Sequence, residues 1–492
     1  MTVPINGRMA RIDAPALVDL LGLWSQADGP LYRLLAARLG RLADSGGLTP
    51  GLRLPPEREL ADALSVSRNT VAMAYQMLRD DGMAESRQGS GTRVVPHRTT
   101  PAAVHRANGF FTGMLETCSG IDLTLAAVDC APPVAAALDD PSSVLSCAER
   151  RALTAGSGYL PYGQPVLRVA LADMLTSRHE LPTHTEQMLV TTGGQQALDL
   201  LFRSELMPGQ AAVVEDPTFP GVFDALQRAG ARPVGVPPGD VERLAAAVAT
   251  HAPALVYLIP THQNPVGSVM PAGARRSVVA LARRYPDVTF VEDMTLAEIG
   301  LSESPRAVPL GGLAPDLPNL VTIGSLSKVY WGGLRTGWVR APAGLAARLA
   351  AAKSAADLGS TAYQQGIVAA LIRGQHESIV AWRASWARAR LSALTAGLRS
   401  WLPSWTWEAP AGGLTIWARL PGGPGDPGSP GGPGGLGGAD SSAFAQAALR
   451  RGVAVVPGRL LSAAGGGSSY VRVAFTRDPA ELSAACAILA EV

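Results

Sequence analysis

Lysine is nearly absent from this 492-residue chain, since only two of its 42 basic residues, Lys328 and Lys353, are lysines. Arginine therefore stands at almost every position where a positive charge is enough, a compositional bias that says nothing about function by itself. Arginine keeps its proton, however, and cannot act as an amine nucleophile. Lys353 lies in an alanine-rich helical pattern and is expected to be a solvated surface lysine, which leaves Lys328 as the candidate for amine chemistry.

Long hydrophobic runs are also missing, and cysteines are few. No apolar run approaches the roughly 18 residues that span a bilayer, and the first thirty residues lack the features of a signal peptide. We therefore expect a soluble cytoplasmic protein. No C-x-x-C pair indicates a zinc site or a disulfide framework, so no metal is expected and the four cysteines are expected to be core thiols: Cys118, Cys130, Cys147 and Cys486.

The charge balance is nearly neutral, with a net charge of +2. Residues 1–95 contain eleven Arg against ten Asp plus Glu, so this part is not a strongly basic domain. Any contact with DNA must then come from local placement of arginines. The 47% hydrophobic content is enough for a sizeable core and argues against general disorder.

Three segments differ in pattern. Residues 28–95 hold short helical patterns that end in a glycine-containing hairpin, residues 96–117 are polar and irregular, and residues 118–492 alternate strand-like runs with amphipathic helices. That alternation is typical of an α/β domain with a parallel sheet, in which ligands bind at the carboxyl ends of strands. The clearest strand-like runs are 188–192, 211–215, 254–259, 288–292, 320–323 and 470–475.

One tract inside the large segment cannot form a packed core. Residues 421–439 contain ten Gly and five Pro among nineteen residues. Such a tract cannot offset the conformational entropy lost on ordering, so we expect a disordered insertion within a C-terminal subdomain.

The N-terminal segment has the pattern of a helix-turn-helix. A short helix is expected within residues 54–64, where prolines and two glutamates suit the first turn. Ser65-Val-Ser67 then supplies a turn and a serine N-cap for a second helix, from Arg68 to about Asp80. Recognition residues lie at the exposed start of such a helix, which here is Ser67, Arg68, Asn69 and Thr70.

A glycine-closed hairpin follows at Met83–Val95 and suits a wing. Pattern alone leaves a helical interaction module with an ordinary hairpin as an equal alternative. The strings Pro30-Leu-Tyr-Arg, Leu54-Pro-Pro-Glu-Arg-Glu-Leu, Ser67-Arg-Asn-Thr-Val and Arg87-Gln-Gly-Ser-Gly-Thr, however, resemble in order and spacing the winged head of GntR-family bacterial regulators. The resemblance implies that double-stranded DNA lies near Arg53, Arg58, Arg68, Thr70, Arg87 and Gly89.

Lys328 lies among groups that suit a phosphorylated carbonyl cofactor. The segment Gly324-Ser-Leu-Ser-Lys-Val-Tyr-Trp-Gly-Gly-Leu-Arg335 directly follows a strand-like run. The hydroxyls of Ser325 and Ser327 and the guanidinium of Arg335 could converge on a phosphate. Pyridoxal phosphate needs such donors, a lysine for an imine, a carboxylate for the ring nitrogen, a partner for the ring oxygen and a stacking ring.

Four further positions could supply the remaining groups, and each also has an ordinary structural explanation. Asp293 ends a strand-like run, as many surface aspartates do. Gly193-Gly-Gln-Gln196 opens a helix and offers an anion cradle, although a lone Gly-Gly turn is weak evidence. Asn264-Pro265 could be only a turn, and Phe219 only a core residue.

Together these segments resemble the fold-type I, aspartate-aminotransferase-like family over nearly all of residues 118–492. The resemblance implies Lys328 for the imine with pyridoxal 5'-phosphate, Asp293 for the ring nitrogen, Asn264 for the ring oxygen, Phe219 for the ring face, and Gly194, Gln195, Ser325, Ser327 and Arg335 for the phosphate. On the substrate or effector side it implies Arg472 for an α-carboxylate, with Tyr162 and Gly163 lining the site.

Thr295 departs from the family pattern, which commonly has a tyrosine two residues after the aspartate, in contact with the ring oxygen. A shorter threonine puts efficient transamination in doubt more than cofactor binding, and an aminotransferase-like half-reaction stays open.

A GntR-like head joined to an aminotransferase-like domain resembles the MocR-type regulators. This resemblance implies a homodimer in which pyridoxal phosphate or an amino compound, sensed at Lys328, alters the grip of the heads on DNA. Two alternatives remain: a working class I/II aminotransferase with an accessory head, and a DNA-binding protein whose large domain is only structural.

Overall fold

The computed structural model describes a head and a large domain. The described residues are 11–22, 24–25, 29–44, 46–87, 91–95, 120–302, 306–422 and 440–492. The expected linker at 96–117, residues 423–439 of the expected insertion, Gly89 and Cys118 lie outside these ranges, as does the side chain of Arg87. No helix in the described part of the chain is long and apolar enough to cross a membrane.

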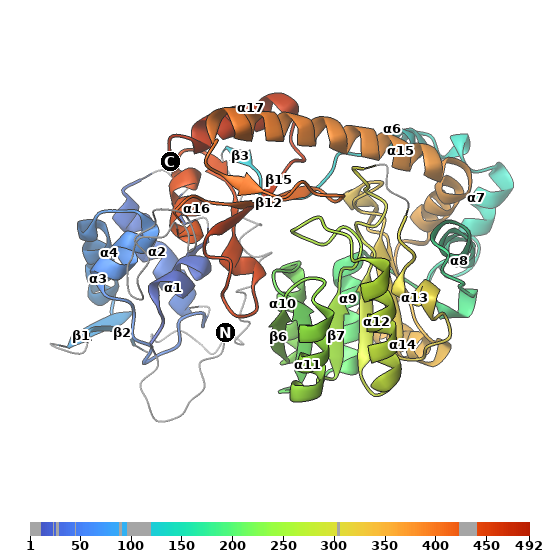
Figure 1. Cartoon of the computed structure of the whole chain (residues 1–492), viewed down its shortest axis with the longest axis horizontal. Helices are drawn as coiled ribbons and strands as arrows, with labels where there is room; N and C mark the ends of the chain where they lie inside the picture. Colours follow the sequence, from blue (N-terminus) through green and yellow to red (C-terminus); the bar gives the residue numbers. More distant parts are fainter. Residues whose placement is uncertain are drawn as a thin grey trace.

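The head is a winged helix-turn-helix with one apolar core (Figure 1). Helix α1 lies ahead of residue 28, where the head was expected to begin, yet its Leu17 and Leu21 are buried in the same core as Leu39, Leu60 and Val71. Its elements are α1 (Ala14–Leu21), α2 (Leu31–Asp44), α3 (Glu57–Leu64), α4 (Arg68–Asp80), β1 (Ala84–Arg87) and β2 (Gly91–Val94).

Interactions between nearby residues form the helix-turn-helix as expected. The Ser67 side chain caps α4 by accepting a hydrogen bond from Thr70 N at 3.1 Å. Ser65 ends α3 in the left-handed conformation, with φ of 51°, and so makes the turn between the two helices. The buried Tyr75 hydroxyl donates to Pro55 O at 2.9 Å, which ties α4 to the segment that enters α3.

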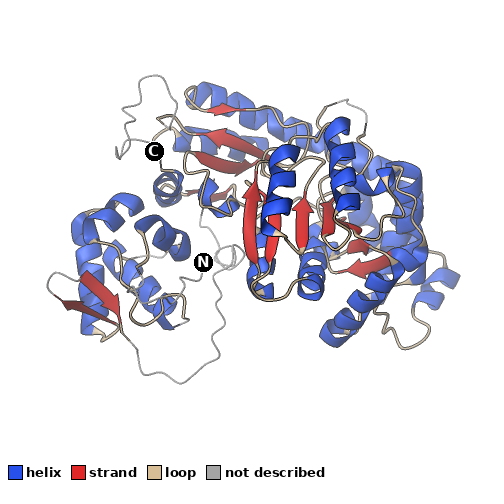
Figure 2. Cartoon of the chain, turned by 60° about the horizontal axis from the view of Figure 1, so that its bottom comes forward, coloured by secondary structure: helices blue, strands red, loops and turns tan. Residues whose placement is uncertain are grey.

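A seven-stranded sheet forms the centre of the large domain, with helices on both faces (Figure 2). All six expected strands are present within a residue or two of their predicted ends. The strand β10 was not expected, and it runs antiparallel to both of its neighbours in an otherwise parallel sheet. In spatial order the strands are β4 (Met188–Thr191), β10 (Gly337–Arg340), β9 (Leu320–Ser325), β8 (Thr289–Asp293), β7 (Leu255–Leu258), β5 (Ala211–Glu215) and β6 (Arg232–Val236).

Successive side chains of each strand point to opposite faces of the sheet, so the sheet contributes to two separate cores. Val214 and Tyr257 point to one face, while their chain neighbours Val213 and Val256 point to the other. The first face is covered by α9 (Gly194–Glu205), α10 (Gly221–Ala229) and α14 (Ala343–Asp357). The second is covered by α11 (Val241–His251), α12 (Ala272–Arg284) and α13 (Leu310–Leu313).

The C-terminal subdomain is built on a 40-residue helix, α15 (Ala362–Trp401), which runs along the upper side of the molecule in Figure 1. Its antiparallel sheet contains β11 (Thr406–Trp407), β12 (Thr415–Arg419), β15 (Tyr470–Ala474) and β14 (Val456–Pro457). Helices α16 (Ser441–Arg450) and α17 (Pro479–Leu489) flank this sheet, and the short η4 (Gly458–Leu461) follows β14. The pair β13 (Val453–Ala454) and β3 (Ile121–Asp122) joins the subdomain to the start of the large domain.

The remaining elements lie between β3 and the central sheet or beside it. They are α6 (Pro132–Asp139), η1 (Pro141–Ser143), α7 (Cys147–Leu153), α8 (Pro165–His179), η2 (Thr185–Gln187) and η3 (Gly332–Leu334).

Two expectations about exposure are wrong. The Lys353 side chain is fully buried, because its aliphatic stem packs within α14 while its ammonium pairs with Asp357 Oδ2 at 2.6 Å and Gln196 Oε1 at 3.1 Å. Cys147 is exposed at the start of α7, whereas Cys486 is buried as expected and Cys130 is partly buried.

Candidate functional site

A cavity of about 400 Å³ opens at the carboxyl ends of the sheet strands, where an α/β fold places its ligands. It brings together every cofactor residue expected from the sequence, together with Arg472. The lining side chains that carry chemistry are Gly194, Gln195, Phe219, Asn264, Asp293, Thr295, Ser325, Ser327, Lys328, Arg335 and Arg472.

Lys328 follows β9, and its ammonium is buried in the cavity wall. Its Nζ donates to Ala126 O at 2.7 Å. Burial, assisted by the positive charges of Arg472 and Arg335, lowers the pKa of Lys328 from 10.5 to about 8. Near neutral pH roughly a tenth of the Lys328 side chains are therefore neutral amines, the form that nucleophilic attack requires.

The backbone after Lys328 is held from α15. Arg383 is fully buried, and its guanidinium donates to Val329 O at 2.9 Å, Tyr330 O at 3.1 Å and Asp129 O at 2.6 Å. Its Cζ lies 4.7 Å and 4.8 Å from the ring centroids of Trp382 and Trp386. One arginine thus links the lysine segment to the segment that contains Ala126.

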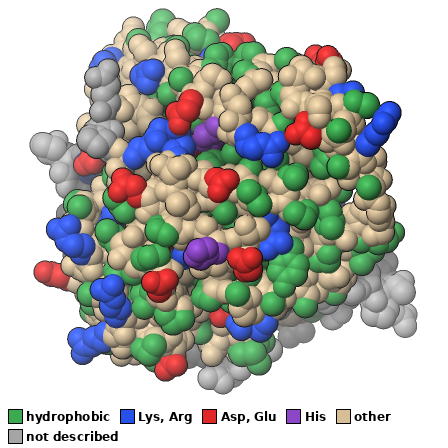
Figure 3. Space-filling view, turned by 90° about the vertical axis from the view of Figure 1, so that its right-hand side faces the viewer, with side chains coloured by type: hydrophobic (Ala, Val, Ile, Leu, Met, Phe, Trp, Pro, Cys, Tyr) green, Lys and Arg blue, Asp and Glu red, His purple; other side chains and the backbone are tan. Residues whose placement is uncertain are grey.

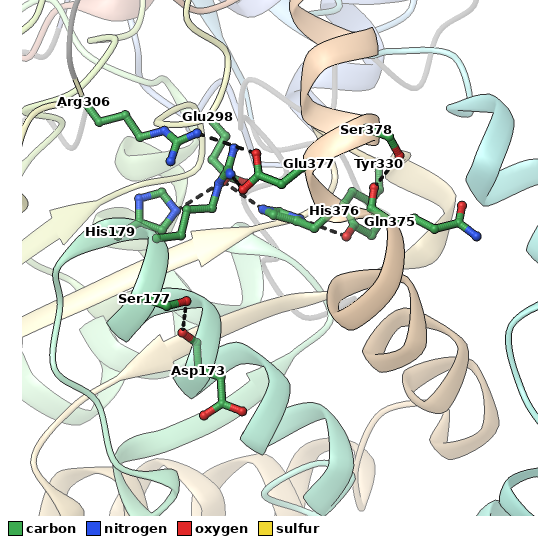
Figure 4. Close-up of polar contacts among 11 residues, drawn as sticks. Asp173, Ser177, His179, Glu298, Arg306, Tyr330, Gln375, His376, Glu377 and Ser378 are labelled. Atoms are coloured by element: carbon green, nitrogen blue, oxygen red, sulfur yellow. Dashed lines mark hydrogen bonds and ion pairs between the residues drawn. The ribbon is translucent and has the colours of Figure 1, made fainter.

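A buried polar cluster that includes His376, also on α15, supports the same segment at the Tyr330 side chain (Figure 4). The Tyr330 hydroxyl lies 3.0 Å from His376 Nδ1, and His376 Nε2 lies 2.9 Å from Glu298 Oε1. Arg178 Nε donates to the same Glu298 oxygen at 2.6 Å, and His179 Nε2 lies 3.2 Å from it. Burial raises the pKa of Glu298, but the hydrogen bonds from His179 and His376 outweigh it and hold that pKa well below its usual value.

Asp293 ends β8 with both carboxylate oxygens engaged by neutral donors. Tyr257 Oη donates to Oδ2 and Thr295 N donates to Oδ1, both at 2.7 Å. Burial raises the pKa of Asp293. A carboxylate in such a place is stabilised by a cationic ligand group, such as a protonated ring nitrogen.

Another group of residues in the cavity lining suits an anion. The N-terminus of α9 begins at Gly194, and its free backbone amides and helix dipole favour negative charge. Gly193 has φ of 115°, and a Cβ there would lie 3.1 Å from Arg335 Nη2, so glycine permits the close approach of the guanidinium. Ser325 Oγ lies 2.9 Å from Ser327 Oγ and completes the group.

Asn264 and Phe219 also line the cavity. Asn264 Oδ1 is buried and has no hydrogen-bond partner among the described residues. Since buried polar atoms are normally paired, this orphan favours a polar ligand in the cavity. Gln195 Oε1 is in the same state, while its Nε2 donates to Gly221 O at 2.9 Å.

The residues expected on the substrate side do not all reach the cavity. Arg472 on β15 lines it, with Nη2 donating to Thr124 O at 2.6 Å, and burial lowers the pKa of this guanidinium to about 10. Tyr162 and Gly163 do not line it. Tyr162 instead lies under the Arg168 guanidinium, and Gly163 packs beside Val190 and Gln365.

Two parts of the site were missed from the sequence. Tyr257 was read only as part of an apolar strand, although a hydroxyl inside such a run signals a buried partner. The stretch Thr124–Ala127 also lines the cavity, and its apolar composition carries no chemical signal.

In the head, the expected DNA residues form an exposed surface. Arg58, Ser67, Arg68 and Asn69 are exposed, and the Arg68 side chain is 74% accessible while it pairs with Glu57 at 3.3 Å. Arg53 is partly buried and lies against the wing strand at Gly91. The Thr70 hydroxyl is 2.8 Å from Ser67 Oγ and so serves the helix cap.

Comparison with known proteins identifies relatives of both parts. Residues 129–489 match the family described as aminotransferase class I and II, and residues 31–94 match bacterial regulatory proteins of the gntR family. Helix α1 lies outside both matches.

Two regulators and one enzyme illustrate the similarity. The HTH-type pyridoxine biosynthesis transcriptional regulator PdxR of Corynebacterium glutamicum is 31% identical over 63% of this chain and 65% of its own length. The probable rhizopine catabolism regulatory protein MocR of Rhizobium meliloti is 30% identical over 66% and 68%. The α-aminoadipate aminotransferase LysN of Thermus thermophilus, solved with N-(5'-phosphopyridoxyl)-L-leucine, superposes with a TM-score of 0.63 and 26% identity over 76% of this chain and 91% of its own.

The pKa of Lys328 can be tested without any cofactor, because the chain has only one other lysine. An amine-acylating reagent should modify Lys328 slowly at pH 6, where the ammonium is protonated, and increasingly as the pH rises through about 8. Arg472→Met removes a nearby positive charge and should move this midpoint upward. Peptide mass spectrometry measures both, and Lys353, which is buried and paired with Asp357, should remain unmodified in the folded protein. A midpoint near 10.5 in the wild type would contradict the assignment.

Proposed function

This chain belongs to the aminotransferase class I and II family and, by its gntR-type head, to the MocR-type subfamily of GntR regulators; from that premise we propose that it senses pyridoxal phosphate or an amino compound at Lys328. The occupancy of the cavity then sets how tightly the heads hold DNA. A ligand can do this only if it binds two states of the protein with different affinity.

The observation that carries the proposal is the set of groups gathered in one cavity. A low-pKa amine, a buried carboxylate and the N-terminus of a helix that favours an anion all line it. Pyridoxal phosphate has an aldehyde, a basic ring nitrogen and a phosphate, and when bound it would supply an electron-accepting ring for amine chemistry. The chain's residues fit this group, because Asn264 lines the cavity with its Oδ1 unpaired and its Nδ2 would be the donor that the ring oxygen needs.

We assign the residues to parts of the cofactor accordingly. Lys328 would hold the aldehyde carbon through its amine, Asp293 the ring nitrogen, Asn264 the ring oxygen, Phe219 the ring face, and Gly194, Gln195, Ser325, Ser327 and Arg335 the phosphate. The buried Arg472 guanidinium would bind the carboxylate of an amino-acid effector.

An active aminotransferase is the second candidate, favoured by the completeness of the same set. Thr295 argues against it, since its side chain is shorter than the tyrosine common at this position. The Tyr257 hydroxyl is not a replacement because it is bonded to Asp293. Rapid multiple turnover with an amino donor and a keto acceptor would favour the enzyme over the sensor.

We further propose a homodimer formed on the side that carries α7 and α8, where hydrophobic side chains lie among charged ones (Figure 3). Four large apolar side chains are 40% to 66% exposed and lie near the α8 N-terminus: Tyr159, Val166, Val169 and Leu358. The loops are adjacent, since a Cβ at Gly359 would lie 2.6 Å from Leu160 O. Tyr162 and Gly163 border this patch, which suits a role toward the partner's cavity.

Cofactor attachment is tested with a matched pair of substitutions. Purified protein should bind pyridoxal phosphate with a visible absorbance that persists after dialysis. Lys328→Arg keeps the positive charge but cannot condense with an aldehyde, so the absorbance should be lost. Lys353→Arg should retain it. Equal absorbance in both variants would refute the role of Lys328.

Dimerisation is tested by sedimentation. Val169→Glu places a charge in the apolar patch and should shift the protein toward monomer at micromolar concentration. Met207→Glu, at a residue that is 67% exposed after α9, is the control and should leave the dimer intact. A monomeric wild type, or a dimer unaffected by Val169→Glu, would argue against this interface.

DNA recognition is tested with duplexes that the wild-type protein selects from a random-sequence pool. Arg68→Ala should weaken binding roughly tenfold or more, because the side chain stands exposed at the start of α4. Arg41→Ala, at an exposed arginine in the last turn of α2, should change affinity little. Comparable losses in both variants would show that α4 does not read the DNA. The same duplexes, titrated with and without pyridoxal phosphate and candidate amines, test the sensing role.

A further inference from the structure

The head does not stand apart from the large domain, because it contacts α16 at two places. The first contact is at the turn of the helix-turn-helix. Arg450, at the end of α16, donates from Nη1 to Leu64 O at 2.8 Å and from Nη2 to Ser65 O at 2.9 Å. These carbonyls end α3, where the helix dipole is negative, so a guanidinium is well placed there. They also lie directly before the start of α4.

The second contact is between α1 and the beginning of α16. Gln446 Nε2 donates to Gly22 O at 3.0 Å, and Ser442 Oγ donates to Asp19 Oδ1 at 3.3 Å. Arg459 of η4 pairs with Asp19 Oδ2 at 3.9 Å. Asp19 is largely buried here. Burial, with the nearby Asp440 and Asp13, raises its pKa to about 7, while Arg459 and the Ser442 hydroxyl lower it.

The same η4 segment reaches the cavity wall on its other side. Thr218 N donates to Leu461 O at 2.9 Å, and Asp216 Oδ2 accepts from Ser462 Oγ at 2.9 Å and Ala463 N at 3.1 Å. Phe219, which lines the cavity, is the next residue along from Thr218. The strand before η4 pairs Val456 with Arg472, which also lines the cavity.

We propose that α16 and η4 form the seat of the DNA-binding head and carry the state of the cavity to the helix-turn-helix. The proposal rests on the sensing function given above. A ligand that moves Phe219 or Arg472 must strain η4, and η4 holds Asp19 of α1. The position of α4 relative to the large domain then depends on whether the head rests on α16 and η4. The ligand in the cavity need not contact the head.

Two features suit a contact that can open. Helix α1, which contacts the seat, lies outside the gntR match at 31–94. Two buried polar atoms at the seat, Gln446 Oε1 and Ser441 Oγ, have no hydrogen-bond partner among the described residues, and Arg459 Nε has only its long contact to Asp19. Such unpaired groups lower the net stability of the docked arrangement, so small changes at η4 can release it.

Hydrogen exchange of the full-length protein, read by mass spectrometry with and without pyridoxal phosphate, tests the seat. Arg450→Ala removes both carbonyl contacts and should speed exchange about tenfold in α4 and also in α1, which Arg450 does not touch. The matched control is Arg451→Ala, at the adjacent residue, whose side chain pairs with Glu491, two residues after the end of α17. The control should exchange like the wild type in both helices.

The measurements with pyridoxal phosphate distinguish failure of the proposed seat from failure of the proposed sensing function. In the wild type and in Arg451→Ala, bound pyridoxal phosphate should change exchange in α1 and α4, whereas in Arg450→Ala it should not. Equal α1 exchange in Arg450→Ala and Arg451→Ala would overturn the seat. Visible absorbance with no change in head exchange would overturn the coupling and leave cofactor binding intact. Absence of the absorbance itself would overturn the proposed function and the coupling with it.

Discussion

The chemistry of the large domain depends on the burial of one amine, that of Lys328. Lys328 loses hydration at the end of β9, and two neighbouring guanidiniums add to the cost of its positive charge. The neutral form becomes accessible near neutral pH, so the chemistry of the cavity follows from desolvation, not from an adjacent base. A buried lysine also needs a rigid surround, because any movement that admits water restores its ordinary pKa.

The residues that hold the surroundings of Lys328 in place come from distant parts of the chain. The segment after Lys328 is held by Arg383 from the long helix α15 and by the Glu298 cluster, while the segment of Ala126 is held by Arg472 through Thr124 O. These arginines donate mainly to backbone carbonyls. They therefore fix the path of the main chain around the cavity, whichever side chains the ligand later meets.

The C-terminal subdomain adjoins both the cavity and the head. Arg472 on β15 lines the cavity, η4 accepts a hydrogen bond from Thr218, the residue before Phe219 in the cavity lining, and α16 contacts the head. One small sheet and its helices therefore adjoin both the candidate site and the head.

The sequence by itself determined the local elements and the identity of the reactive groups. The apolar strand-like runs, the Ser67 cap and the helix start at Gly194 depend on a few neighbouring residues, so these were predicted correctly, and the shortage of lysine directed attention to Lys328. The same shortage also misled, since Lys353 was expected in solvent and is buried beside Asp357.

Only the tertiary structure decided which distant residues meet. The antiparallel pairing of β10 with β4, the hydrogen bond from the Tyr257 hydroxyl to Asp293, the contacts of Arg383 and the contact of the head with Arg450 join residues between 36 and 386 positions apart in the chain. Such contacts depend on which strands and helices become neighbours when the two faces of the sheet are covered. No local period encodes that choice, because it is made by the packing of the whole domain.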